Sequence, residues 1–146
     1  MENLVDLLQR RAQEAPDFTP FIFLRNGETE EVPLSQREFD AKAQHIAAQL
    51  QPLDLKGERL LILFPQGNEY LISIFGAFYA GVIAVPGYPP RNNRNLLRLE
   101  AIMKDCDARY ILADQKTVEY MEGRDGRFSA YTFLVYDDLL NQSALD

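Results

Sequence analysis

Two short stretches of this chain hold side chains that could bind charged groups. Gln66–Asn68 lies between an apolar run and a helical pattern, at the kind of helix start where backbone N–H groups bind anions. It has a single glycine and no following lysine, so we interpret it as a tight turn with a helix cap. Arg91, Arg94 and Arg98 form a basic cluster in a chain of net charge −7. A solvated helix start is the favoured interpretation of these arginines, and docking of an acidic protein is the alternative.

The only histidine and the only cysteine are both candidates for chemistry, and neither has partners placed by the sequence. His45 lies beside the apolar stripe of a predicted helix, with no nucleophile or carboxylate spaced to work with it, so we expect a solvated helix flank. Cys106 falls on a helical apolar face and is interpreted as a core residue. The sequence contains no Cys/His cluster, and we predict no transition-metal site.

The fold around the stretch Glu58–Pro90 must position the candidate side chains named above. It contains two apolar runs, Leu60–Phe64 and Val82–Val85, separated by an almost wholly apolar segment. The first run lacks polar alternation, which is typical of a parallel strand covered on both faces. We therefore predict a right-handed β-α-β unit.

The helix of this unit is expected to begin at Asn68, whose side chain would cap it. Its apolar residues point in every direction, which predicts a helix buried all round. Phe75 should then lie between the sheet and neighbouring helices. Gly76 would allow another element to approach the backbone closely, and Gly81 suits the left-handed conformation that ends a helix.

Segments before and after this unit complete an alternating pattern of helices and strands. Before it, the sequence predicts a helix over 3–15, a two-residue hairpin turn at Asn26-Gly27, and a helix after 35–38 with a capping box and a core stripe. After it, we predict a helix with the apolar face Leu96, Leu99, Ile102, Met103 and Cys106, strands at 110–113 and 131–136, a short helix at 117–121, a turn at 123–126 and a terminal helix from Asp137. The fold class is α/β: a doubly wound, mostly parallel sheet with flanking helices and an N-terminal β-hairpin.

Length and composition fit one domain over residues 1–146. The net negative charge argues against nucleic acid as a partner. The apolar run Tyr70–Pro86 is shorter than the roughly 20 residues of a membrane span and contains two glycines, so we predict no span. A lone cysteine and an acidic N-terminus without a signal-peptide pattern predict a cytoplasmic protein.

Several motifs resemble those of adenylate-forming enzymes, which include acyl- and aryl-CoA ligases and adenylation domains. Ala80–Pro86 resembles the "AG…VP" element near their start. Leu34–Phe39 resembles their "(T/S)YxEL" motif, with Gln36 in place of the usual tyrosine. The continuation is similar to that of the fatty acyl-AMP ligases at Tyr88-Pro89-Pro90-Arg91, Arg94, Leu96, Arg98-Leu99, Ile102 and Asp105. The similarity runs from about Leu4 to Tyr136.

The resemblance implies that residues 1–146 are the N-terminal subdomain of a larger ligase. Such an enzyme uses ATP and Mg²⁺ to convert a fatty acid to acyl-adenylate, and passes the acyl group to the phosphopantetheine thiol of an acyl carrier protein. The family's lysine-ended phosphate loop and its catalytic C-terminal lysine have no counterpart here. We therefore assign no catalytic, cofactor-binding or metal-binding residue, and we expect a scaffold that is inactive alone.

Two other interpretations remain open from the sequence: part of an acyl-CoA ligase, and a non-enzymatic α/β interaction module.

The sequence also leads to an expectation about oligomeric state. A sheet that normally packs against the rest of a ligase would leave apolar surface uncovered in this chain. We therefore expect weak self-association of this chain, with a homodimer favoured and the net charge opposing it.

Overall fold

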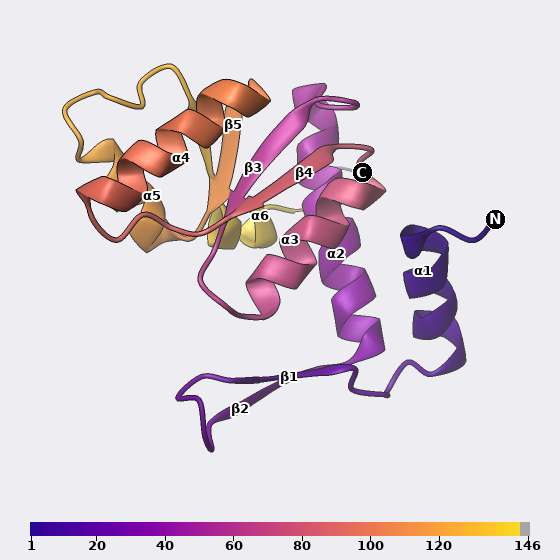
Figure 1. Ribbon diagram of the computed structural model, residues 1–146. Coiled ribbons are helices and arrows are strands. Elements are labelled where there is room, and N and C mark those ends of the chain that lie inside the picture. Colours follow the sequence, from indigo (N-terminus) through magenta and orange to yellow (C-terminus); the bar gives the residue numbers. More distant parts are fainter. Residues whose placement is uncertain (144–146) are drawn as a thin grey trace.

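The computed structural model describes residues 1–143 of the chain (Figure 1). Its strands are β1 (Phe21–Leu24), β2 (Glu31–Leu34), β3 (Arg59–Leu63), β4 (Ile83–Gly87), β5 (Tyr110–Ala113) and β6 (Thr132–Val135). Its helices are α1 (Leu4–Glu14), α2 (Gln36–Leu50), the short 3₁₀ helix η1 (Gln51–Leu53), α3 (Asn68–Tyr79), α4 (Asn93–Cys106), α5 (Gln115–Glu122) and α6 (Tyr136–Asn141).

The strands form a four-stranded parallel sheet of order β4-β3-β5-β6 and a separate antiparallel hairpin of β1 and β2. β3 is central: its residue Leu61 lies opposite Val85 of β4 and Ile111 of β5. The predicted α/β class, with a doubly wound parallel sheet and an N-terminal hairpin, is confirmed. The predicted β-α-β unit is the pair β3 and β4 with α3 between them.

Helices cover both faces of the sheet, and β3 contributes to two cores (Figure 1). Leu60 and Ile62 join the core that lies against α2, α3 and α6. Leu61 and Leu63 join the core beneath α4 and α5. Because alternate side chains of a strand point to opposite faces, a strand with two covered faces needs apolar residues throughout. This explains the unbroken apolar run in the sequence.

The two longest helices of the first layer, α2 and α3, cross in close contact at Gly76. A β-carbon at position 76 would lie 2.6 Å from Cγ2 of Ile46, so only glycine fits without movement. The expected capping box starts α2: Ser35 Oγ accepts from the backbone N–H of Glu38 at 3.2 Å. Gly81 follows α3 with φ +70°, the predicted left-handed conformation.

The hairpin turn is longer than the predicted two residues. Arg25 and Glu30 still pair, with the Arg25 N–H donating to the Glu30 carbonyl at 2.9 Å, so four residues form the loop. Asn26 Oδ1 accepts from the backbone N–H groups of residues 28, 29 and 30 at 2.8–3.1 Å. An asparagine side chain that satisfies three backbone donors stabilises this wider loop.

The prediction that α3 is buried all round is wrong. Phe78 is 36% exposed, and Phe75 is half-buried. Phe75 packs edge-on against Phe39 of α2, with ring centroids 5.0 Å apart, and not between the sheet and a helix. The small residues of α3 form its innermost side, with Ser73, Gly76 and Ala77 all buried.

The exposure of three further side chains, and the first residue of the last helix, also differ from the sequence predictions. Ile102 and Cys106 were predicted on the buried face of α4, but Ile102 is exposed and Cys106 half-buried. His45 is half-buried, not solvated, and its Nε2 lies 3.1 Å from the Leu139 carbonyl oxygen of α6. Since a carbonyl can only accept, Nε2 donates in this contact. The last helix starts at Tyr136, one residue before Asp137.

The two outer strands of the sheet differ in their free edges. In β4 the Ile83 N–H donates toward β3, to the Glu58 carbonyl at 2.8 Å. Alternate residues of a strand point their backbone groups to opposite sides, so Pro86 belongs to the outward set and removes a donor from that edge. In β6 the Thr132 N–H donates toward β5, to the Arg109 carbonyl at 2.9 Å, so Phe133 belongs to the outward set.

Candidate functional site

The carboxyl ends of the four parallel strands form the edge where open α/β sheets bind ligands. The chain leaves β3 toward α3 on one face and leaves β4 toward α4 on the other face. Such a reversal beside β3 is a topological switch point, the usual place of a ligand crevice. Around it lie the turn Gln66–Asn68, the segment Tyr88–Pro90 and Tyr136.

The turn Gln66–Asn68 is occupied by the chain's own side chains. Gly67 is the N-cap of α3 and makes no side-chain cap, so the predicted cap by Asn68 is wrong. Asn68 Nδ2 instead donates to the Val32 carbonyl of the hairpin at 3.1 Å. The Glu69 carboxylate folds back so closely that its Oε2 would lie 2.7 Å from a β-carbon at position 67. An anion at this helix start would meet that carboxylate, so the turn is poorly suited to phosphate.

An aromatic pair closes the same edge of the sheet. Phe64, just after β3, packs edge-on against Tyr136, with ring centroids 5.6 Å apart. Burial raises the pKa of Tyr136 well above that of a free tyrosine, and the nearby carboxylates of Glu69 and Asp137 raise it further. The hydroxyl therefore stays protonated near neutral pH and cannot serve as a base. Its contribution at this edge is packing.

An apolar hollow of about 470 Å³ lies between the hairpin and the start of α3. Its lining combines the hairpin's inner strand with the turn and first residues of α3: Pro20, Phe21, Ile22, Phe23, Gln66, Gly67, Asn68, Tyr70 and Leu71. Burial, with a smaller effect of Tyr88, raises the pKa of Tyr70. A mostly apolar wall with few polar groups is suited to an apolar chain or to another protein segment.

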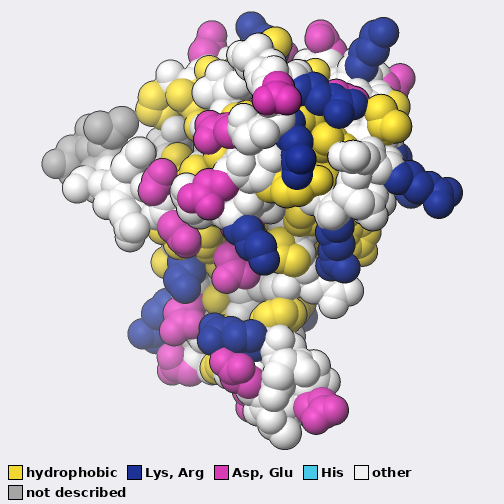
Figure 2. Space-filling view, turned by 90° about the vertical axis from the view of Figure 1, so that its left-hand side faces the viewer, with side chains coloured by type: hydrophobic (Ala, Val, Ile, Leu, Met, Phe, Trp, Pro, Cys, Tyr) yellow, Lys and Arg dark blue, Asp and Glu magenta, His cyan; other side chains and the backbone are white. Residues whose placement is uncertain are grey.

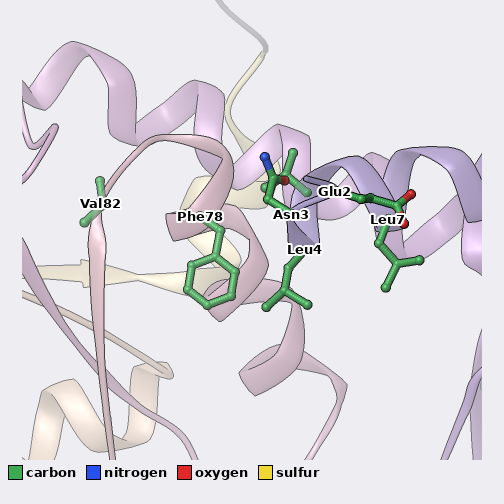
Figure 3. Close-up of a pocket in the computed structure, with 7 residues that line it drawn as sticks. Glu2, Asn3, Leu4, Leu7, Phe78 and Val82 are labelled. Atoms are coloured by element: carbon green, nitrogen blue, oxygen red, sulfur yellow. The ribbon is translucent and has the colours of Figure 1, made fainter.

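A wider apolar hollow of about 740 Å³ separates α1 from the junction of α3 and β4. Figure 3 shows Leu4 of α1 and Phe78 of α3 pointing into the same space, with Glu2 and Asn3 at the rim. The sequence patterns do not predict this surface. The signal that could have revealed it was an apolar Phe78 on the side of α3 opposite the small residues that approach α2.

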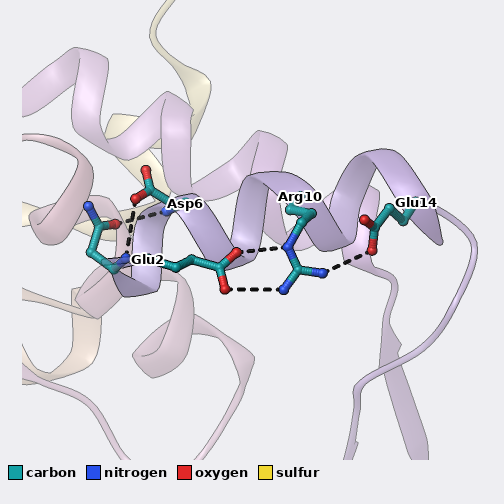
Figure 4. Close-up of polar contacts among 5 residues, drawn as sticks. Glu2, Asp6, Arg10 and Glu14 are labelled. Atoms are coloured by element: carbon teal, nitrogen blue, oxygen red, sulfur yellow. Dashed lines mark hydrogen bonds and ion pairs between the residues drawn. The ribbon is translucent and has the colours of Figure 1, made fainter.

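Charged residues hold the N-terminal segment against α1 beside that hollow (Figure 4). Arg10 Nε donates to Glu2 at 2.7 Å, and its Nη1 donates to Glu14 at 3.0 Å. Asn3 and Asp6 complete a capping box at the helix start. All these groups are exposed, so their net contribution to stability is small.

The three arginines of the basic cluster lie at or near the start of α4, on the face of the sheet opposite to α2 and α3. Arg91, Arg94 and Arg98 are exposed and have no ion pair within residues 1–143. Figure 2, which faces the side where α4 and α5 lie, shows Lys and Arg side chains beside exposed apolar groups. The helix-start interpretation is consistent with their exposure.

No catalytic constellation is found among the described residues. His45 contacts a backbone carbonyl, and Cys106 Sγ lies 3.6 Å from the Met103 carbonyl oxygen. Residues 1–143 contain no group of three or more His, Cys, Asp or Glu side chains placed to hold a metal ion. The same part of the chain has no helix that is long and apolar enough to cross a membrane.

The amino-acid sequence of this chain is similar to those of known proteins. The profile described as AMP-binding enzyme matches residues 8–144. The medium-chain-fatty-acid–[acyl-carrier-protein] ligase JamA of Moorena producens is 46% identical over 115 residues, which are 77% of this chain and 19% of that protein. The long-chain-fatty-acid–AMP ligase FadD32 of Mycobacterium marinum is 36% identical over 122 residues, 80% of this chain and 19% of that protein.

Solved structures show the same arrangement of elements. A fatty acid AMP ligase from Legionella pneumophila superposes with a TM-score of 0.82 at 28% identity, over 92% of this chain and 23% of that one. The N-terminal subdomain of Klebsiella oxytoca NpsA superposes with a TM-score of 0.73 over 100% of this chain and 33% of that one. Its 19% identity shows the fold alone. The chain thus spans about a fifth of the length of these curated relatives.

Proposed function

The chain belongs to the AMP-binding enzyme family, and on that premise we propose that it is the N-terminal part of a fatty acyl-AMP ligase. The whole ligase would join a fatty acid carboxylate to the α-phosphate of ATP, release pyrophosphate, and pass the acyl group to a carrier-protein thiol. The observation that carries this proposal is the 46% identity with the JamA ligase, whose name specifies a fatty acid and an acyl carrier protein. The 28% identical Legionella structure supports it.

Within such a ligase, these residues would supply the scaffold and part of the wall around an apolar substrate. The hollow between the hairpin and α3 opens beside the carboxyl edge of the sheet and has an apolar lining. The residues present do not fit a site for Mg²⁺ or a triphosphate, since there is no metal-binding cluster in residues 1–143 and Glu69 covers the start of α3. ATP and Mg²⁺ would be held by parts of the ligase that this chain does not supply.

We expect the isolated chain to form no acyl-adenylate. It has no lysine-ended phosphate loop and no cluster of metal ligands within residues 1–143, so the groups that neutralise charge on the transferring phosphate are not assembled. The measurement is pyrophosphate release with ATP, Mg²⁺ and medium- or long-chain fatty acids, with the complete JamA ligase as positive control. Fatty-acid-dependent release above the protein-free background would contradict the scaffold role.

The family-level proposal is tested by a chimera in which this chain replaces the matched segment of the JamA ligase. If the chain is the corresponding part of such a ligase, the chimera should form acyl-adenylate at a rate within about tenfold of the parent enzyme. The matched control is the same chimera carrying Gly76→Val, which disturbs the contact between α2 and α3. A folded chimera that releases no pyrophosphate, beside an active parent, would favour the non-enzymatic module.

A further inference from the structure

The outward face of α4 combines unpaired positive charge with exposed apolar surface. Leu96, Leu99 and Met103 turn inward and are buried. On the opposite side of the helix lie Arg94, Leu97, Arg98 and Ala101, which share one face because residues three and four apart are neighbours. We call these four residues, with Arg91 just before the helix, the basic face of α4. Leu97 at its centre is 60% exposed.

Many of the positively charged residues of the chain lie on or near this face. Although the net charge is −7, eight of the fifteen Lys and Arg residues lie within residues 91–127. Elsewhere in residues 1–143, some exposed arginines are paired, such as Arg10 with Glu2 and Arg25 with Glu30, while others, such as Arg59, have no ion pair. The arginines of the basic face have no ion pair in that part of the chain. Their guanidinium groups are available to carboxylates of another molecule, which they bind in a planar, two-pronged geometry.

We propose that the basic face of α4 docks an acidic protein surface, that of the acyl carrier protein which would accept the acyl group. This identification of the partner rests on the proposed function. Carboxylates of the partner pair with Arg94 and Arg98, and Leu97 fills an apolar contact between them. A face of about three helical turns forms a small interface, which fits a carrier that binds and leaves in each cycle.

The position of the face in the fold agrees with delivery to the substrate edge. α4 begins at Asn93, shortly after β4 ends at Gly87, so Arg91 and Arg94 lie near the carboxyl edge of the sheet. That edge also holds the hollow between the hairpin and α3. A carrier docked on the first turns of α4 would bring its tethered thiol toward the same edge.

Other classes of partner fit the basic face less well. Recognition of anionic lipid surfaces typically uses four to eight clustered Lys and Arg residues, and this face offers three arginines. Nucleic acid binding calls for a strongly basic domain, whereas this chain has a net charge of −7.

The test measures binding of the 146-residue chain to a fluorescently labelled acyl carrier protein in its apo form, which lacks the thiol arm. We expect saturable binding that weakens as salt rises.

Three variants test which residues are responsible. Arg94→Glu should weaken binding at least about tenfold, because like charges would then face each other. Lys42→Glu on α2 is the matched control: it changes the net charge equally from an exposed position on the other side of the sheet, and should change binding less than about twofold. Leu97→Ser should weaken binding while the unfolding midpoint stays unchanged.

Each other outcome decides against the proposal. Absence of binding, or equal effects of Arg94→Glu and Lys42→Glu, would overturn it. So would binding to vesicles of anionic phospholipid that Arg94→Glu abolishes, if the carrier does not bind. The JamA chimera separates this result from the proposed function: pyrophosphate release without carrier binding rejects only the docking face. Carrier binding together with a folded but inactive chimera rejects only the ligase assignment.

Discussion

Ile62→Ala should reduce the free energy of unfolding by about 2–5 kcal/mol, one of the two largest losses expected in this chain. Ile62 lies at the middle of the central strand β3, opposite Pro86 on one side and Leu112 on the other, and is fully buried. Truncation removes buried apolar surface and leaves a cavity that neighbouring strands cannot fill. Urea unfolding followed by circular dichroism gives the loss.

Ile83→Ala is the matched control for that measurement. Ile83 is the same residue type in the adjacent strand β4, but it is 48% exposed. Its truncation should cost about 1 kcal/mol, mostly through lower strand propensity and partial burial. Equal losses for the two variants would show that β3 is not the centre of the folded chain.

Gly76→Val should be comparably damaging, with an expected loss of about 3 kcal/mol. The new β-carbon would lie 2.6 Å from Cγ2 and 2.8 Å from Cβ of Ile46, and 3.1 Å from the Ala43 carbonyl oxygen. The valine methyl groups add further overlap, so α2 and α3 must separate. The higher helix propensity of valine over glycine offsets only a few tenths of a kcal/mol.

A double-mutant cycle identifies the contact that is responsible. Ile46→Ala alone should be destabilising, because Ile46 is fully buried. Combined with Gly76→Ala, it removes Cγ2, the atom of Ile46 nearest to the new methyl group, and leaves only Cβ in close contact. The double variant should therefore lose less stability than the sum of the two single losses, with a coupling of about 0.5–3 kcal/mol. Strict additivity in thermal or urea unfolding would mean that Gly76 is not required at the helix crossing.

The fold class was predictable because its signals are local and agree with one another. The apolar run of β3, the small residues that face α2 and the left-handed Gly81 each specify the β-α-β unit independently. The prediction failed where a side chain has a distant partner. Asn68 does not cap α3 because its amide bonds Val32, thirty-six residues earlier, and no local pattern contains that information.

The exposed surfaces were harder to predict than the core. The sequence of α3 is apolar all round, yet α1 packs loosely beside it and leaves Phe78 facing a hollow. A hydrophobic pattern states which side chains avoid water, not whether a partner within the same chain covers them. The arginine cluster, in contrast, was visible in the sequence. Only the structure shows that Arg94 and Arg98 share their helix face with exposed Leu97.

The position of Pro86 bears on how this protein behaves when it is produced at high concentration. An added strand at β4 would find no hydrogen-bond donor at Pro86, so chains are hindered from stacking there into extended sheets. The outer side of β6 carries no such block, since Phe133 keeps its N–H. Precipitation through strand addition, if it occurs during expression, should therefore start at β6.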